Sequence, residues 1–335
     1  MWITSFCASL CVVGVAAVRT SDHAENGNST SILAVPPLPF QSEMRKRASE
    51  CLSQSVPESQ FILNTADGLS NKMLGDHLVD ALKKMRNATG KKNRTEKVRI
   101  VGIWDARVPT RAKDDDAKSV ATLAEIQEFF IVDNEKARLN RWLKQPAEWY
   151  DILLHEDAFS ESAAITAVEG ADIFYLAGGS AYFLMAAFER RKSFWEQTVL
   201  PKIRGGQLIH VSESAGSIAS GTHIGIARGS RGAGYWWDRT GKEEGLGLVP
   251  GILRPHYNKD LEPALKEYAE EVGAKVVPFA NGEAVEWAGH GRIVGRANDK
   301  IDEGKEAAFF AQWAIGHGMK DAKKHYDTLL QNMFA

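Results

Sequence analysis

The sequence has few cysteines, little net charge and no long hydrophobic run after its first twenty residues. Only three cysteines occur in 335 residues, and Cys7 and Cys11 both lie in the N-terminal apolar run. If that run is removed, Cys51 remains alone, which excludes an intramolecular disulfide framework. The formal net charge of −2 favours neither a nucleic acid nor another polyanion as partner. No later run is apolar enough to span a bilayer, so we expect no stable membrane span.

The N-terminus has the character of a secretory leader. Ile3 to Val18 is apolar and rich in small residues, and Val15-Ala-Ala17 suits signal-peptidase cleavage, although a basic flank is missing. We interpret residues 1–18 as a signal peptide and expect a secreted or secretory-pathway glycoprotein. Three Asn-x-Ser/Thr sequons agree with this location, at Asn28, Asn87 and Asn93.

The next segment, residues 19–56, is polar and sustains no hydrophobic period, so we expect a disordered leader. It contains Arg45-Lys-Arg47, which offers a processing site, although a solvated linker is the interpretation that we favour. Residues 57–335 are expected to form a single domain, because that length suffices to bury a full core.

From Phe61 onward, short apolar runs alternate with segments of helical spacing. Five runs predict strands, near residues 61–63, 98–104, 149–154, 171–176 and 208–211. Strands that are apolar throughout and alternate with helices are typical of a parallel sheet covered on both faces. We therefore predict an α/β fold with a doubly wound parallel sheet. Near the C-terminus, three further short strands predict a β-hairpin region, at residues 275–279, 284–287 and 292–295.

The stretch around Ser214 carries the most specific chemistry. An apolar run at residues 208–211 leads through small residues into Ser217–Ser220, which can begin a helix. A serine at a strand-to-helix corner projects its hydroxyl from the sheet, and the following amide lies at a helix N-terminus. That geometry suits a nucleophile, although the same residues also suit a tight turn with close packing.

A nucleophilic serine needs a base within hydrogen-bond reach and donors for the developing oxyanion. Among the histidines after Ser214, His256 follows Pro255 and ends an apolar run at Leu253. It can therefore lie at a strand end that faces the serine. The alternative is a structural histidine that donates to a backbone carbonyl.

Three short motifs are more specific together, in this order and at this spacing, than any of them is alone. They are Ala177–Leu184, Ser212–Gly216 and Gly247–Tyr257. Together they resemble peptidase family S51, which includes aspartyl dipeptidase (peptidase E) and cyanophycinase. The resemblance runs from about Phe61 to Arg296. It implies a class I glutamine-amidotransferase-like, flavodoxin-like fold, a Ser–His–acid triad and an acyl-enzyme, with a small peptide as substrate and no cofactor or metal. We expect a monomer or homodimer.

By this resemblance Ser214 is the nucleophile, His256 is the general base, and the amides of Gly179 and Ala215 bind the oxyanion. A Gly-Gly pair at a strand end lets the backbone approach a substrate closely, although it also suits a simple helix-entry turn. The expected substrate-binding residues are Gly178, Ser180 and Glu213.

The chain departs from the family pattern in three ways. Glu213 precedes the nucleophile where relatives carry an aromatic or small residue, and its carboxylate could repel acidic substrates or pair with an arginine. The third triad position matches Asn281, whose amide oxygen can orient an imidazole but cannot stabilise imidazolium by charge. Glu283 and Asp238 are alternative third members. The arginine that aspartyl dipeptidases use for an acidic substrate has no clear match. Basic candidates are Lys259, Arg228 and Arg231.

Other functions remain to be weighed against an S51 serine peptidase. A general Gly-x-Ser-x-Gly α/β-hydrolase would place Ser212 at the first glycine and use His317 or His325 as base. A glutamine amidotransferase would need a cysteine in place of Ser214. The main alternative is a catalytically weak or inactive relative that acts as a binding protein, which the amide at Asn281 motivates.

Overall fold

The computed structural model describes residues 48–68, 72–90, 97–110, 123–124, 131–143, 145–227, 243–257 and 262–295. All of them fall within one compact unit, Pro39–Ala335. The predicted signal peptide and most of the predicted leader lie outside the described residues, as do Asp238, His317 and His325.

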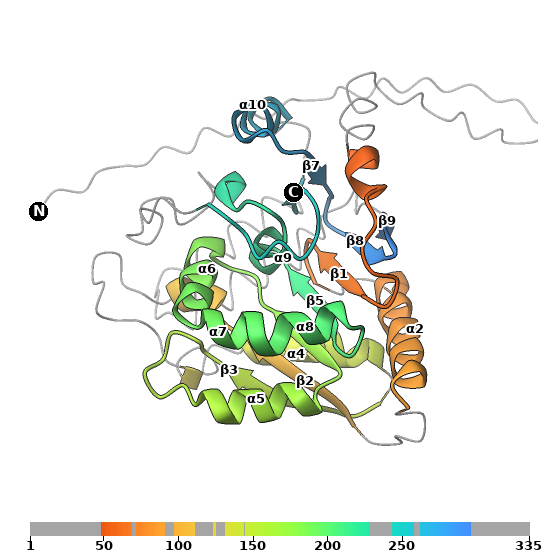
Figure 1. The fold of residues 1–335 in the computed structure, drawn as a ribbon, viewed down its shortest axis with the longest axis vertical. Helices are drawn as coiled ribbons and strands as arrows, with labels where there is room; N and C mark the ends of the chain where they lie inside the picture. The colour runs from red at the N-terminus through yellow and green to blue at the C-terminus, as the bar shows by residue number, and fades with distance from the viewer. Residues whose placement is uncertain are drawn as a thin grey trace, which may run out of the picture. The chain divides into compact units, whose positions relative to one another are not determined.

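A seven-stranded sheet forms the centre of this unit (Figure 1), in the order β3-β2-β4-β5-β1-β8-β9. The first five strands in this order are parallel, and β8 adds to β1 in the antiparallel direction, followed by β9. The predicted α/β fold is confirmed, with a sheet that is mostly parallel rather than wholly so. The strands are β1 (Ile62–Thr65), β2 (Val98–Ile103), β3 (Ala147–Ile152), β4 (Ile173–Leu176), β5 (Ile209–Glu213), β8 (Glu283–Ala288) and β9 (His290–Gly295).

Helices lie on both sides of the strands (Figure 1). On one side α2 (Lys72–Ala88) packs closely on α4 (Ile131–Leu143), because Gly75 leaves room for the Trp142 ring. A Cβ atom at Gly75 would lie 2.5 Å from that ring. The other helical segments are η1 (Asp105–Thr110), α5 (Glu161–Gly170), α6 (Ala181–Arg190), α7 (Lys192–Phe194), η2 (Trp195–Val199), α8 (Leu200–Arg204), α9 (Ala215–Ser220), η3 (Gly225–Ala227) and α10 (Glu262–Val272).

Successive residues of the central strands point to opposite faces, as the pleat of a strand requires. In β4 the Phe174 ring lies 6.1 Å from the Trp195 ring of η2, whereas the Tyr175 hydroxyl lies 3.0 Å from Glu135 of α4. The Phe174 side of β4 therefore packs on an aromatic residue of η2, and the other side carries a buried polar group close to the carboxyl ends of the strands.

Two further strands, β6 (Ile252–Arg254) and β7 (Val276–Pro278), form a separate parallel pair in which Arg254 aligns with Pro278. The sequence predicted strands on either side of the Asn281-Gly282 turn, and they are present. They belong to different sheets, however, since β7 pairs with β6 while β8 pairs with β1 and β9. Local pattern cannot distinguish these pairings, because the choice depends on distant partner strands.

Residues 48–56, which we assigned to the polar leader, belong to the fold instead. A helical segment covers residues 48–52, and both Ala48 and Cys51 are 1% exposed. The Cys51 thiol lies 3.1 Å from the Pro250 carbonyl oxygen, and burial raises the pKa of that thiol. The prediction failed because the two small apolar residues stand among polar neighbours and show no sustained period.

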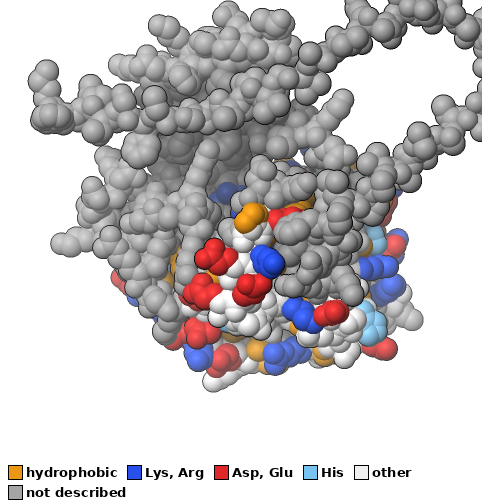
Figure 2. Space-filling model, turned by 90° about the horizontal axis from the view of Figure 1, so that it is seen from above, with side chains coloured by type: hydrophobic (Ala, Val, Ile, Leu, Met, Phe, Trp, Pro, Cys, Tyr) orange, Lys and Arg blue, Asp and Glu red, His pale blue; other side chains and the backbone are white. Residues whose placement is uncertain are grey.

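The surface of the described part carries both signs of charge. Figure 2 shows Asp and Glu side chains interspersed with Lys and Arg on the face seen from above. Asn87 of the second sequon is exposed in the last turn of α2, while Asn28 and Asn93 lie outside the described residues. Across the described ranges, the helices are too short or too polar to cross a membrane.

A buried histidine lies in the middle of β5. His210 is fully buried, stacks on Phe174 at 6.3 Å and has its Nε2 atom 2.9 Å from Ser220 Oγ. Because Ser220 Oγ donates to the Gly216 carbonyl, the His210 Nε2–H donates to Ser220. The Nδ1 atom has no partner among the described residues. Burial lowers the pKa of His210 from 6.5 to about 3.

We predict that His210 makes the fold sensitive to acid. Between pH 6.5 and about 3 the unfolded chain binds a proton at this site and the folded chain does not, so stability is lost as the pH falls through this window. The unfolding free energy should fall by about 2 kcal/mol from pH 7 to pH 5 on this account. In His210→Gln, which keeps a donor at the same atom, urea unfolding should lose this pH dependence. His290→Gln on β9 serves as the exposed control, and an unchanged pH slope in His210→Gln would contradict the prediction.

Candidate active site

Ser214 sits at the carboxyl end of β5, at the corner where α9 begins. Its backbone has φ 47° and ψ −107°, a conformation that is costly for a residue with a side chain. Within the described ranges only Ser214 and His256 combine a side chain with positive φ, and His256 has φ 53°. Strain of this kind costs of order 1–3 kcal/mol for each residue and clusters at functional sites.

The Ser214 turn is held by hydrogen bonds to β1. The Thr65 carbonyl accepts from the Ser214 amide at 3.0 Å and from the Ser217 hydroxyl at 2.8 Å. The Ser217 hydroxyl also lies 3.0 Å from Ser212 Oγ, which donates to Asn64. These small polar residues, which read as a turn signal in the sequence, fix the corner against its neighbouring strand.

His256 lies beside Ser214, as the sequence predicted. Its Nε2 atom is 2.8 Å from Ser214 Oγ, and its Nδ1 atom is 2.7 Å from Asn281 Oδ1. An amide oxygen can only accept, so Nδ1 carries the proton and Nε2 offers its lone pair to the serine hydroxyl. The His256 side chain is exposed and Ser214 is half-buried, so a substrate can reach both.

The β6–β7 pair explains how residues so distant in sequence meet. Its last aligned residues are Arg254 and Pro278. Beyond them, the Tyr257 amide donates to the Phe279 carbonyl at 3.1 Å. Because the two segments remain paired beyond the strands, His256 and Asn281 lie side by side, and the His256 imidazole contacts the Asn281 side chain.

Glu283 and Asp238 were the predicted alternatives to Asn281 at the third triad position. Glu283 has its carboxylate on the Ala280 amide at 2.9 Å, where it stabilises the turn that carries Asn281. Asp238 lies outside the described residues, as do Lys259, Arg228 and Arg231. Among the predicted candidates that the structure describes, Asn281 is therefore the one that contacts the imidazole.

The Gly178-Gly179 pair passes directly against Ser214. A Cβ atom at Gly178 would lie 3.2 Å from Ser214 Cβ, and one at Gly179, where φ is 132°, would lie 2.0 Å from the Ala106 carbonyl oxygen. The amides of Gly179 and Ala215 have no hydrogen-bond partner among the described residues. Within the described ranges both amides are therefore available as donors. The Ser180 hydroxyl, expected near the substrate, instead caps α6 by accepting from the Phe183 amide at 3.2 Å.

Glu213 pairs with arginines, the second of the two roles we considered for it. It is 6% exposed, and its carboxylate lies 3.4 Å from Arg138, 3.6 Å from Arg107 and 2.9 Å from the Tyr175 hydroxyl. Burial alone would raise the pKa of Glu213, but the charges of Arg138 and Arg107 and the bond from Tyr175 outweigh it. The pKa therefore lies below its ordinary value, and Glu213 is a buried carboxylate rather than an exposed substrate ligand.

Sequence reasoning missed most of this polar cluster. Arg107 also pairs with Glu135, and Tyr175 lies within hydrogen-bond distance of both Glu135 and Glu213. Arg107 follows β2 and Arg138 lies on α4, so nothing local marks either as part of a site. The sequence signal available was Glu213 itself, which lies in a stretch that is otherwise predicted to be buried. A buried carboxylate needs a partner that neutralises its charge.

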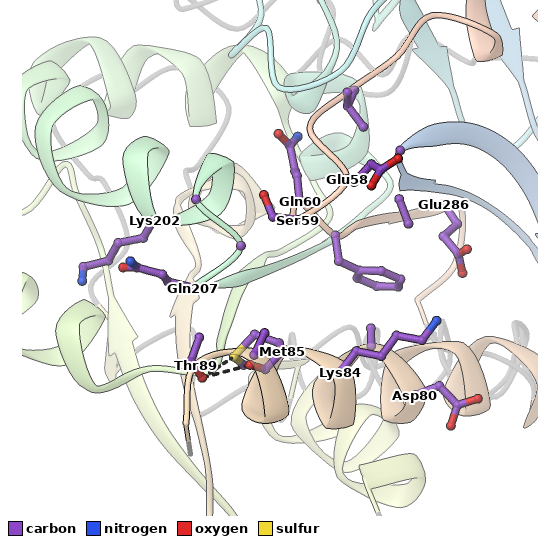
Figure 3. A pocket seen from close by; sticks show the side chains of 18 of the residues that line it. Glu58, Ser59, Gln60, Asp80, Lys84, Met85, Thr89, Lys202, Gln207 and Glu286 are labelled. Atoms are coloured by element: carbon purple, nitrogen blue, oxygen red, sulfur yellow. Dashed lines mark hydrogen bonds between the residues drawn. The ribbon is translucent and has the colours of Figure 1, made fainter. Parts of the chain in front are cut away.

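A cavity of about 1220 Å³ lies elsewhere, at the other end of the strands. Figure 3 shows it between α2 and the segment that carries Glu58, Ser59 and Gln60. Its lining includes Gln207 before β5, whereas Ser214 follows β5. The buried Glu286 carboxylate at this cavity is already bound by His77 and Arg292. The cavity is therefore distinct from the Ser214 site. No set of three or more metal-binding side chains occurs in the part of the chain that the structure describes.

Residues 137–294 match the sequence model of peptidase family S51. The resemblance to peptidase family S51 is confirmed. The matched region contains the glycine pair, Ser214, His256 and Asn281, and it supports a peptidase and therefore a hydrolase. No curated protein matches the chain. A solved structure of a protein provisionally named peptidase E, from Listeria monocytogenes EGD-e, is similar at 17% identity with a TM-score of 0.45, covering 71% of this chain and 98% of the other.

We predict that the two glycines respond differently to alanine. In Gly179→Ala the new methyl group collides with the Ala106 carbonyl, and φ is unsuitable, so the protein should lose several kcal/mol of stability. In Gly178→Ala the nearest atoms are Ser214 Cβ at 3.2 Å and Arg107 Nη2 at 3.3 Å, so a shift of a few tenths of an ångström accommodates the methyl group but displaces Ser214. This variant should fold and react about tenfold more slowly at Ser214. Thermal unfolding and labelling by a serine-directed phosphonate check both, and equal losses of stability would contradict the prediction.

Proposed function

We propose that this protein is a serine peptidase that hydrolyses small peptides through an acyl-enzyme, in the manner of S51 dipeptidases. The observation that carries the proposal is the chain of contacts from Asn281 Oδ1 through the His256 imidazole to Ser214 Oγ, at 2.7 and 2.8 Å. Both distances lie in the range that proton transfer and orientation require. The strained backbone of Ser214 and His256 supports the same assignment.

In the proposed reaction Ser214 Oγ attacks the peptide carbonyl carbon while His256 Nε2 takes the hydroxyl proton. The amides of Gly179 and Ala215 donate to the oxyanion that forms on the carbonyl oxygen. His256 then gives the proton to the leaving amine, and the C–N bond breaks. Water, activated by His256, hydrolyses the resulting ester and restores Ser214. Throughout, Asn281 holds the imidazole in the tautomer that leaves Nε2 free.

A second candidate function is a catalytically weak or inactive relative that binds a peptide or partner. Asn281 favours it, because an amide orients the imidazole but adds no negative charge beside the imidazolium that forms during attack. The two candidates differ in one property, the reactivity of Ser214.

We predict that Ser214 reacts as a nucleophile. The purified protein should form a covalent adduct with a serine-directed phosphonate, located at Ser214 by mass spectrometry, and should cleave short peptides. Ser214→Ala should abolish both while keeping the thermal unfolding temperature of the parent protein. Turnover that survives in Ser214→Ala would refute the serine mechanism. A folded parent protein that forms no adduct would support the binding protein.

The second prediction concerns Asn281. In Asn281→Asp a carboxylate replaces the amide at the same atom, and kcat/KM should rise by about 10- to 100-fold, which corresponds to the 1.5–3 kcal/mol of a charged hydrogen bond. Asn281→Ala should instead lower kcat, because the imidazole loses its orientation. Steady-state kinetics on a short peptide measure both effects. If neither variant changes the rate, Asn281 is not the orienting group.

A further inference from the structure

A second set of contacts, behind the catalytic trio, joins the turn that carries Ser214 to the turn that carries Asn281. Arg138 of α4 makes the connection. One of its terminal nitrogens lies 3.4 Å from Glu213 Oε1, and the other donates to the Asp67 carbonyl oxygen at 3.2 Å. Glu213 is bonded covalently to Ser214, so this guanidinium reaches the nucleophile through one residue.

The other end of the connection leads to Asn281. The Asp67 carboxylate accepts from the Gly282 amide at 3.2 Å, and Gly282 is the next residue after Asn281. The contacts therefore close a ring. It runs from Ser214 through Glu213, Arg138 and Asp67 to the Asn281 turn, and returns through the imidazole of His256.

We expect the Glu213–Arg138 ion pair to be stable in the folded protein. Glu213 is buried and needs cationic partners, of which Arg138 lies 3.4 Å and Arg107 lies 3.6 Å from its carboxylate. The guanidinium presents a planar fork that can bind two acceptors at fixed geometry, as it does here with Glu213 and Asp67. The charge of Glu213 raises the pKa of Arg138, so the pair stays ionised.

We propose that Glu213 and Arg138 are positioning residues, which hold the nucleophile turn and the Asn281 turn in register so that His256 bridges them. The inference rests on the proposed peptidase function. Orientation matters more in this chain than in one with a triad carboxylate, because Asn281 contributes geometry without charge. A displacement of about 1 Å at a reacting group can cost about 100-fold in rate.

The test compares Glu213→Gln and Arg138→Gln with Lys136→Gln as matched control. Lys136 lies on the same helix and pairs with Asp151 at 2.5 Å, with both side chains mostly buried, but it is not part of the ring. We expect kcat and the rate of phosphonate labelling of Ser214 to fall about 10- to 100-fold in the first two variants, with KM within about twofold of the parent value. Lys136→Gln should keep the parent kcat at a similar loss of thermal stability.

The double variant Glu213→Gln/Arg138→Gln separates positioning from independent damage. If the two residues act as one unit, the kcat of the double variant should equal that of the slower single variant. Independent effects would instead multiply the two fold-losses in kcat. Multiplied losses, or an equal fall of kcat in Lys136→Gln, would overturn the proposal.

An NMR measurement that needs no turnover distinguishes the positioning proposal from the peptidase proposal. The His256 Nδ1–H proton signal in NMR, identified by its absence in His256→Gln, reports the contact with Asn281. It should shift or broaden in Glu213→Gln and Arg138→Gln and stay unchanged in Lys136→Gln. If the parent protein forms no phosphonate adduct, the peptidase proposal fails, and this signal still decides whether Glu213 and Arg138 position the trio. An unchanged signal would overturn the positioning role.

Discussion

The strained backbone of Ser214 is the constraint on which the site depends. A residue with a side chain adopts φ 47° only where its surroundings hold it there. Three features do so. The Thr65 carbonyl holds the Ser214 amide, and Gly178 leaves space against the Ser214 side chain. Gly216 lets α9 pack closely on β4, since a Cβ atom there would lie only 2.6 Å from the Leu176 carbonyl oxygen. Together these contacts direct the Ser214 hydroxyl toward His256.

The two faces of β5 serve different purposes. On one face His210 and Phe174 pack in an apolar environment, where burial keeps the imidazole neutral. On the other, Glu213 enters a cluster with Arg138 and Arg107. Buried ion pairs generally add little net stability, because desolvation offsets their attraction. This cluster lies directly behind Ser214, whose imidazole partner is oriented by an amide, and we therefore interpret it as a contribution to geometry.

Every strand of the seven-stranded sheet could be predicted from the sequence, because the signal of each is local. Short apolar runs and helical spacing depend only on neighbours in the chain. The failures have a different origin. Residues 48–56 carry two buried residues in a polar setting, and the β6–β7 pairing depends on strands that are separated by a helix. Arg138 has no local mark at all, since its role depends on a carboxylate 75 positions away in the sequence.

The sequence by itself determined the α/β class, the strand-to-helix corner at Ser214 and the candidacy of His256, since each follows from residue types in adjacent positions. It left open the partner of Glu213 and the identity of the third member among Asn281, Glu283 and Asp238. Tertiary structure decided that Glu213 meets arginines and that Asn281, rather than Glu283, contacts the imidazole. The physical reason is that hydrogen bonds and ion pairs act over about 3–4 Å, and only the register of paired strands decides which distant side chains come within that range.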